Sequence, residues 1–285
     1  MRQTPSLEST SPEAPARPII VLVPGLQGRH EWLRPAADEL ARTFEVRSLS
    51  LYHPSRPAGD PFEAWVATID DLLVDAGASR ATILGHSFGG LVAVRYAARR
   101  PERVAALILA SAPSPRMALD GRSRFYLRFP WATLPLFVTQ AAFRLAPEMI
   151  AARSTWRGRA ALAASQLLRV VRSPATPGHM AKWVRAWRVM DLWDDCARVA
   201  SPTLVLTGEP GLDRVVPVAS SREYLEGIRQ ARHVVLEGTG HLGLISRPAL
   251  FAEAVRTFVR SSEADAVGDR SGPQVAAEER SERHD

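Results

Sequence analysis

Six short apolar runs, rich in branched side chains, recur along the chain with helix-like segments between them. The runs lie at residues 19–23, 45–49, 81–84, 104–109, 203–206 and 233–236. Their continuous apolar character is typical of strands buried on both faces. The helical patterns lie at residues 31–42, 61–76, 91–99, 217–228 and 248–260. This repeated order of strand, helix and strand predicts an α/β fold with a doubly wound, mostly parallel sheet and right-handed crossovers.

The alternation is interrupted once, between residues 113 and 200. This segment contains apolar and aromatic helical stretches cut by prolines, and it has no convincing strand pattern. It is too long to be a structureless loop inside a compact domain. We therefore predict one α/β core, formed by residues 18–112 and 201–260, and an inserted helical cap at residues 113–200.

The two ends of the chain differ in composition from the rest. Residues 1–17 and 261–285 are polar, rich in Ser, Pro, Glu and Asp, and they are predicted to be disordered tails. No stretch approaches the roughly 20 consecutive apolar residues that cross a bilayer. The N-terminus lacks the pattern of a signal peptide. We therefore expect a cytoplasmic protein, and the sequence leaves its oligomeric state open.

The single cysteine, Cys196, cannot form an intramolecular disulfide. No group of cysteines and histidines has the spacing of a structural zinc site. The neighbouring residues Asp194 and Asp195 give Cys196 no positive surroundings that would lower a thiol pKa, so we expect it to be unreactive. The sequence predicts no metal and no cofactor.

A Gly-x-Ser-x-Gly turn follows the third apolar run, at Gly85-His86-Ser87-Phe88-Gly89. A strand before this pattern and a helix after it are typical of a nucleophile elbow, whose tight bend lifts the serine hydroxyl clear of the sheet. The bend also places the serine at a helix N-terminus, where free amides favour developing negative charge. We predict that Ser87 is a nucleophile. The adjacent His86 is expected to pack beside it, since neighbouring side chains on a tight turn point apart.

The loop after the first apolar run, at residues 24–28, is expected at the same edge of the sheet as Ser87. A tetrahedral oxyanion needs two backbone donors, and the elbow supplies one of them, the amide of Phe88. We assign the second donor to Leu26. The alternative interpretation is that the glycines of this loop only shape a turn.

A catalytic acid and a base are predicted in the last two loops at this edge. Asp213 follows the fifth apolar run, and Glu209, which is closer to the strand end, is the competing carboxylate. His241 follows a glycine-rich loop after the last run, which suits a base that must reach the serine with one ring nitrogen and the acid with the other. The order Ser87, Asp213, His241 is the order expected in a fold with a nucleophile elbow.

Together these motifs resemble the α/β-hydrolase superfamily, particularly its small cap-bearing esterases, lactonases and C–C hydrolases. The resemblance covers roughly residues 18–260, and it rests on Pro24-Gly25, the Gly85 to Gly90 turn, Gly208 with Asp213 and Val216-Pro217, and Gly240-His241. Many relatives carry His-Gly at the first of these positions, a difference that removes no catalytic atom. Haloalkane dehalogenases and epoxide hydrolases have an aspartate where this chain has Ser87, so the resemblance excludes both.

The resemblance and these residues imply hydrolysis of a carboxylic ester through a Ser-His-Asp triad and an acyl-enzyme, with a small ester-like molecule as substrate. Lactone cleavage, C–C cleavage and acyl transfer need the same triad and are not distinguished. A protein of the same fold that binds a small molecule without turning it over is the alternative from a different class. Gly25, Gln27, Trp131 and Phe137 are the predicted substrate contacts.

Basic residues are concentrated in the predicted cap. Between Arg116 and Arg188, twelve arginines and Lys182 stand against only Asp120 and Glu148. One interpretation is weak association of this basic, aromatic-rich segment with an anionic membrane surface. The alternative is that the aromatic residues form the core of the cap and the arginines its solvated face. No motif that reads nucleic acid is present, so nucleic acid is not expected as a partner.

Overall fold

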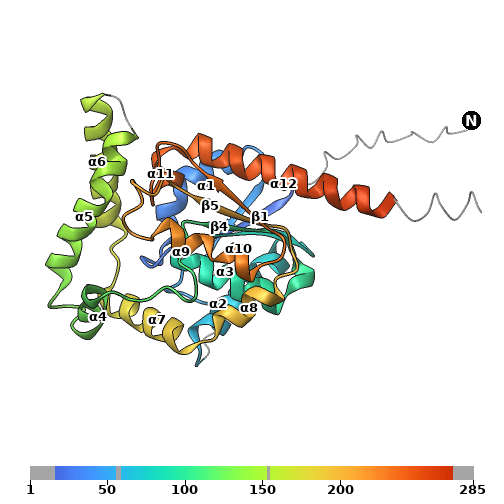
Figure 1. The fold of residues 1–285 in the computed structure, drawn as a ribbon, viewed down its shortest axis with the longest axis horizontal. Helices are drawn as coiled ribbons and strands as arrows, with labels where there is room; N and C mark the ends of the chain where they lie inside the picture. Colours follow the sequence, from blue (N-terminus) through green and yellow to red (C-terminus); the bar gives the residue numbers. More distant parts are fainter. Residues whose placement is uncertain (1–16, 56–58, 153–154, 272–285) are drawn as a thin grey trace, which may run out of the picture.

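The computed structural model describes residues 17–55, 59–152 and 155–271 (Figure 1). Six parallel strands form one sheet in the order β2-β1-β3-β4-β5-β6. The strands are β1 Ile19–Val23, β2 Glu45–Ser48, β3 Ala81–His86, β4 Val104–Ala110, β5 Thr203–Thr207 and β6 Ala231–Val235. This confirms the predicted α/β fold with a parallel sheet.

Helices cover both faces of the sheet, as Figure 1 shows. One face carries a 3-10 turn at His30–Leu33, α1 Arg34–Leu40, α11 Gly243–Ser246 and α12 Pro248–Ser271. The other face carries α2 Pro61–Asp75, α3 Phe88–Arg99, a 3-10 turn at Pro101–Arg103, α8 Leu192–Arg198, α9 Val218–Arg222 and α10 Tyr224–Gly227. The sheet is therefore enclosed on both sides, as a doubly wound fold requires.

Alternate residues of the central strands supply two separate apolar cores. Val21 and Leu107 pack with α2 and α3, whereas Ile20 and Ile108 pack with α1 and α12. All four side chains are fully buried. This two-sided packing fixes the strands tightly, so the loops at their carboxyl ends start from a rigid base.

The two outer strands correct the expectation that every strand is buried on both faces. All residues of β2 are half-buried, and β6 consists of half-buried and exposed positions. Each of these strands lies at an edge of the sheet and pairs with a neighbour on one side only. An apolar run thus predicts the position of an edge strand better than it predicts the burial of that strand.

The last helix continues further than the sequence predicts. α12 reaches Ser271, although disorder is expected from residue 261 onward. Its second half retains contacts with the body of the protein, since Ser262 is buried and Asp265 forms an ion pair with Arg232 of β6 at 3.2 Å. The predictions of disorder at residues 1–16 and 272–285 lie outside the described residues.

The segment between β4 and β5 is mainly helical and contains no strand among its described residues. It forms α4 Gly121–Arg128, α5 Leu134–Ala151, α6 Trp156–Arg172 and α7 Pro177–Val189, followed by α8. α5 and α6 stand beside the sheet rather than against either of its faces (Figure 1). Among the described residues, no helix is both long enough and apolar enough to cross a membrane.

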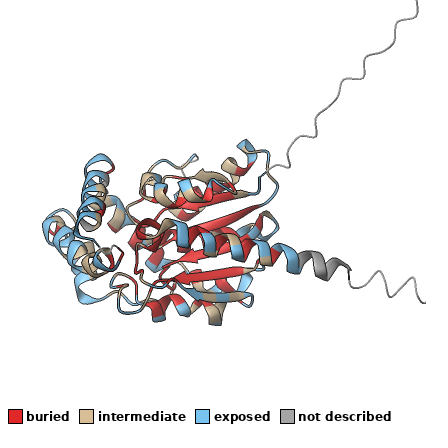
Figure 2. Cartoon of the chain, turned by 90° about the horizontal axis from the view of Figure 1, so that it is seen from above, coloured by how far each residue is buried: buried red, intermediate tan, exposed pale blue. Residues whose placement is uncertain are grey.

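The insertion consists of two differently packed parts. In α7, Trp183 is buried and its ring lies 5.6 Å from that of Trp65 in α2. In α8, the buried Asp195 forms an ion pair with Arg95 of α3 at 2.8 Å. α7 and α8 therefore belong to the main core, so the packing changes before residue 200, the predicted end of the cap. The outer helices α4, α5 and α6 are instead largely exposed (Figure 2).

Hydrogen bonds from α9 and α10 fix the point at which the chain leaves β4 for the insertion. The hydroxyl of Ser221 donates to the carbonyl oxygen of Ala112, and the hydroxyl of Tyr224 donates to that of Pro113, each at 2.7 Å. Both donors are buried. The insertion is therefore anchored to the core at its start by these bonds and at its end by α8.

Candidate active site

Ser87 occupies a strained bend between β3 and α3. Its backbone φ is 52° and its ψ is −126°, a conformation that residues other than glycine rarely adopt. The flanking glycines are required sterically. A Cβ at Gly85 would lie 2.6 Å from the Cα of Gly90, and one at Gly89 would lie 2.5 Å from the carbonyl oxygen of Pro24. The local sequence thus produces the nucleophile-elbow geometry.

The structure brings Ser87, His241 and Asp213 together from three separate loops. Nε2 of His241 lies 3.1 Å from Oγ of Ser87, and Nδ1 of the same ring lies 3.3 Å from Oδ2 of Asp213. Asp213 and His241 are buried, while Ser87 is half-buried. A serine, an imidazole and a carboxylate linked in this way can activate the hydroxyl as a nucleophile.

Asp213 is held as a carboxylate by its surroundings. Burial favours a higher pKa, but the charge and hydrogen bond of His241 and the backbone amides of Val215 and Val216 outweigh burial and lower the pKa of Asp213. Both amides donate to Oδ1 at 3.0 Å. This leaves Oδ2 directed at the imidazole, so the two oxygens have separate partners.

Glu209, the competing acid, lies elsewhere in the same loop. Its Oε1 accepts a hydrogen bond from the backbone amide of Gly238 at 2.5 Å, and its own backbone carbonyl accepts from the amide of Asp213 at 3.0 Å. Glu209 therefore links the loop after β5 to the loop after β6. Of the two candidate acids, Asp213 is the one placed against His241.

His86 is a buried neighbour of the reacting groups. Its Nε2 lies 3.0 Å from the backbone carbonyl oxygen of His241, and the two rings are 5.2 Å apart between centroids. Burial, followed by the charge of His241, lowers the pKa of His86 to about 3. His86 is therefore neutral at physiological pH and packs beside the base, as the sequence predicts.

The loop after β1 lies directly against the elbow. A Cβ at Gly25 would lie 3.2 Å from Cβ of Ser87 and 2.8 Å from Oε1 of Gln27, so the Gln27 side chain folds back over its own loop. Leu26 follows Gly25 and is half-buried, and Phe88 is buried at the start of α3. Leu26 thus follows directly after Gly25, which lies against Ser87, and Phe88 follows directly after Ser87 itself.

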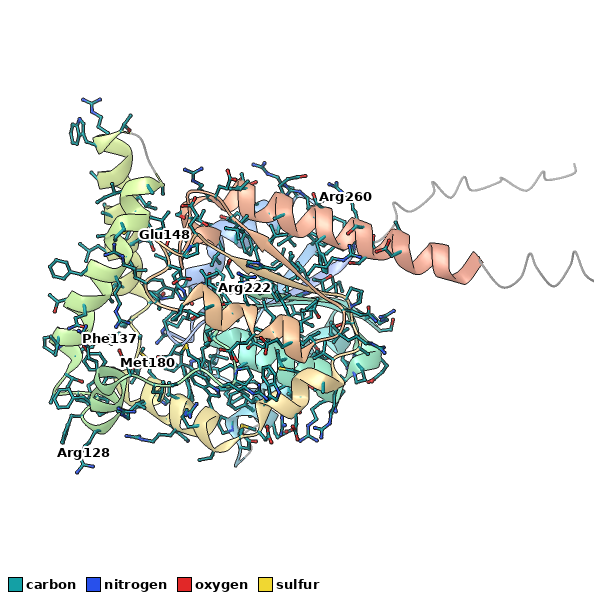
Figure 3. The ribbon with its side chains drawn as sticks, viewed as in Figure 1. Arg128, Phe137, Glu148, Met180, Arg222 and Arg260 are labelled. Atoms are coloured by element: carbon teal, nitrogen blue, oxygen red, sulfur yellow. The ribbon has the colours of Figure 1, made fainter. Side chains whose placement is uncertain are left out.

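The other two predicted substrate contacts are placed differently. The exposed indole of Trp131 packs over Gly178 at the start of α7. The ring of Phe137 packs edge-on against Tyr126 of α4, with 5.6 Å between centroids, and Figure 3 shows it on α5. The structure therefore brings Gly25 to Ser87 with Gln27 beside Gly25, and it places Trp131 against α7 and Phe137 against α4.

Sequence reasoning overlooked Glu148, counting it only as an acid of the cap. This residue is fully buried, and its Oε2 accepts a hydrogen bond from the backbone amide of Leu242 at 2.7 Å. Figure 3 shows it on the side of α5 that faces the body of the protein. The available signal was an acid next to Pro147 inside an otherwise apolar helix, because acids are rarely tolerated in such a place without a buried partner.

Cys196 and clusters of potential metal ligands are the other groups that could form a site. Cys196 is buried, and burial in particular raises the pKa of its thiol to about 12, which keeps it protonated. In the ranges that the structure describes, no group of three or more His, Cys, Asp and Glu side chains is arranged to hold a metal ion.

Comparison of sequences finds known proteins that are similar to this chain. RutD of Pseudomonas savastanoi pv. phaseolicola is 27% identical over 255 residues, which cover 86% of this chain and 94% of that protein. The biotin biosynthesis bifunctional protein BioHC of Cellvibrio japonicus is 28% identical over 252 residues, covering 85% of this chain and 47% of BioHC.

Solved structures share the fold. The enol-lactonase from Burkholderia xenovorans LB400 superposes with a TM-score of 0.68 at 22% identity, covering 86% of this chain and 92% of the lactonase. The 2-hydroxy-6-oxo-6-phenylhexa-2,4-dienoate hydrolase BphD from Rhodococcus sp. strain RHA1 superposes with a TM-score of 0.63 at 20% identity, covering 86% of this chain and 91% of BphD. The model of the alpha/beta hydrolase family matches residues 20–254. The chain therefore belongs to the alpha/beta hydrolase family.

Proposed function

We propose that this family member is a serine hydrolase that cleaves a small carboxylic ester, with Ser87 as nucleophile, His241 as general base and Asp213 as the acid that orients it. The observation that carries the proposal is the continuous contact from Ser87 through both nitrogens of His241 to Asp213, at 3.1 Å and 3.3 Å. These separations are within the reach expected of a nucleophile, its base and the orienting acid.

The proposed cycle uses only groups of this chain and water. His241 takes the proton of Ser87 as Oγ attacks the substrate carbonyl, and the resulting imidazolium is stabilised by the ionised Asp213. The backbone amides of Leu26 and Phe88 hold the oxyanion. The protonated His241 then gives its proton to the leaving alcohol. Water, activated by the same imidazole, finally releases the acid and restores Ser87.

Ester, lactone and C–C cleavage all use these groups and water, and only acyl transfer needs an added alcohol, so product analysis is needed to choose among them. The enol-lactonase and BphD show that proteins of this fold act on lactones and on C–C bonds. Those likenesses are below 25% identity and support the fold alone. Analysis of the products from an ester, a lactone and a vinylogous diketone substrate distinguishes the three reactions, and added alcohol tests for acyl transfer.

The decisive experiment compares wild type with Ser87→Ala and with Ser111→Ala as control. Ser111 is also a serine with positive φ, of 44°, at the carboxyl end of the neighbouring strand. A fluorophosphonate probe should label wild type and Ser111→Ala but not Ser87→Ala. Hydrolysis of p-nitrophenyl esters of graded acyl length should fall by about 10⁴- to 10⁶-fold in Ser87→Ala only. Labelling that persists in Ser87→Ala refutes the nucleophile, and labelling of wild type without any turnover favours a small-molecule-binding protein.

We further propose that the outer helices α4, α5 and α6 present a surface to anionic lipid. In the described residues, 18 large apolar side chains are exposed, and 13 of them lie between Phe125 and Val171. Phe143 and Trp156 are 76% and 73% exposed. Residues 121–172 also contain nine arginines and a single acid, the buried Glu148. This combination of exposed aromatic and cationic side chains matches the acyl boundary and the anionic head groups of a bilayer surface.

Vesicle sedimentation tests this surface. Wild type should pellet with vesicles of phosphatidylcholine and phosphatidylglycerol more than with phosphatidylcholine alone, and salt should weaken the association because it screens charge. Phe143→Ser and Trp156→Ser should reduce binding. The control is Val74→Ser on α2, which changes a residue 67% exposed but outside α4 to α6. Equal binding to both vesicles, no binding, or a dimer in light scattering that Phe143→Ser disrupts would each overturn the proposal.

A further inference from the structure

Glu148 combines full burial with a position on the exposed part of the insertion. It belongs to α5, most of whose large apolar residues are exposed, yet its own side chain is 0% exposed. Acidic residues are rarely buried to this extent unless they are paired or hydrogen-bonded. The contacts of this one carboxylate therefore indicate why α5 meets the core at this point.

Those contacts lie on both sides of His241. Oε2 of Glu148 accepts from the backbone amide of Leu242 at 2.7 Å, and Oε1 accepts from the hydroxyl of Ser246 at 2.9 Å. A Cβ at Gly240 would lie 2.9 Å from Oε2, so the carboxylate also lies directly against the residue before His241. One side chain from α5 thus contacts the backbone around the base and the short helix that follows it.

A neighbouring contact strengthens this junction. Arg247, which follows Ser246, directs Nη2 at the carbonyl oxygen of Ala151, one helical turn after Glu148, at 3.4 Å. Ala152 is buried at the same end of α5. The C-terminal end of α5 is therefore docked on the loop that carries His241, while the rest of the helix remains outside.

We propose that Glu148 is a positioning residue for His241. The inference rests on the proposed triad. By fixing the backbone at Leu242 and packing against Gly240, the carboxylate holds the imidazole within reach of Ser87. Its negative charge adds to that of Asp213 in stabilising the imidazolium that forms when the serine proton is transferred. The groups that face the ring are Ser87, Asp213, the neutral His86 and Glu148, so Glu148 is the second carboxylate beside the base.

The pKa of Glu148 determines how its carboxyl group affects the stability of the fold. Burial raises the pKa of Glu148, although the amides of Leu242 and Gly240, the Ser246 hydroxyl and the charge of His241 oppose that effect. A carboxyl group whose pKa is raised on folding contributes most to stability below its unfolded pKa, and this contribution is lost as pH rises through the folded value. Ionisation of the buried Glu148 therefore costs stability, and Glu148→Gln should leave the melting temperature unchanged or raise it.

The test compares Glu148→Gln and Glu148→Ala with wild type and with Glu223→Gln. Glu223 accepts a hydrogen bond from the hydroxyl of Ser114 at 2.6 Å, so the control removes a comparable carboxylate-to-serine bond elsewhere in the protein. We expect kcat for a p-nitrophenyl ester to fall by about 100-fold in Glu148→Ala, as a displacement of about 1 Å at the reacting groups would cause, and to fall less in Glu148→Gln, which keeps an acceptor for Leu242 but loses the charge. KM should change less than about twofold, and Glu223→Gln should match wild type.

A pH profile separates a positioning role from general support of the fold. Loss of the Glu148 charge disfavours the protonated imidazole, so the acidic limb of the kcat/KM profile should move to lower pH in Glu148→Gln. A variant with wild-type kcat and an unmoved acidic limb overturns the inference, and so does a fall in kcat that is matched by a fall in melting temperature in Glu148→Gln. Failure of the triad itself gives a different result, because wild type would then not be labelled at Ser87 by the fluorophosphonate.

Discussion

Apolar side chains are buried in the sheet core, whereas large apolar side chains are mostly exposed in the outer helices α4 to α6. Leu107 of β4 is fully buried, whereas Leu167 of α6 is 66% exposed. In the core, close packing fixes atoms well enough to hold Ser87 and His241 at 3.1 Å. In the outer helices most apolar area is left uncovered. Internal packing therefore fixes the structure of the sheet core, whereas the exposed apolar side chains of the outer helices are suited to contact with a partner outside the chain.

The largest expected effect tests the precision of the core loops. Asp213→Asn should lower kcat by about 10⁴-fold, because an amide no longer holds the imidazole in the productive tautomer. This corresponds to about 5 kcal/mol in the activation barrier. Glu209→Gln should lower kcat less than about tenfold, since Glu209 contacts the amide of Gly238 rather than His241. Steady-state kinetics on one ester measures both variants, and an equal loss in both would show that the acid is misassigned.

The second prediction tests whether α8 belongs to the core. Asp195→Ala should lower the free energy of unfolding by about 3 to 5 kcal/mol, because it leaves the guanidinium of Arg95 without its buried partner. The control Asp265→Ala breaks the exposed pair with Arg232 and should cost less than about 1 kcal/mol. Urea denaturation gives both values. A small loss in Asp195→Ala would assign α8 to the outer part of the insertion.

The third prediction compares one leucine from each region directly. Leu107→Ala should cost about 2 to 5 kcal/mol of unfolding free energy through lost burial and a cavity. Leu167→Ala should stay within about 0.5 kcal/mol. Should both variants lose the same stability, α6 would have to be packed against a partner in solution, and a second run at lower protein concentration would reveal it.

The smallest effect concerns the strained bend. Ser87→Gly should raise the free energy of unfolding by about 1 kcal/mol. The substitution relieves a backbone strain of about 1 to 3 kcal/mol at φ 52°. The greater freedom of glycine in the unfolded chain offsets about 0.5 to 1 kcal/mol of this gain. Thermal unfolding of wild type and Ser87→Gly measures the difference. A lower melting temperature in the variant would mean that the bend is not strained in solution.

The core was predictable from sequence to a much greater degree than the insertion. The strand before Ser87 and the glycines around it are short-range steric signals, so the elbow could be located without any tertiary information. Asp213 could be preferred to Glu209 only because Glu209 lies closer to the strand end, since both acids occupy the same loop, and only the fold shows which side chain turns toward His241.

Features that depend on contacts between distant segments were not predictable. Glu148 lies 93 residues before His241 in the chain, and its burial depends on how α5 docks. Trp131 and Phe137 were predicted as substrate contacts, and the contacts of Trp131 with Gly178 and of Phe137 with Tyr126 could not be read from the sequence. The extension of α12 past residue 260 likewise brings Asp265 to Arg232 of β6, a contact that the local polar composition does not reveal.

Two anchors hold the ends of the insertion on the catalytic framework, and between them Glu148 ties α5 to the loop of His241. The start is held by Ser221 and Tyr224, and the end is held by α7 and α8, which are packed into the body of the protein. Splice points at these anchors would allow the intervening helices to be exchanged between homologues as a cassette that keeps an acid at the place of Glu148. Such an architecture allows the substrate range to diverge during evolution through replacement of this one segment, while the rest of the gene is retained.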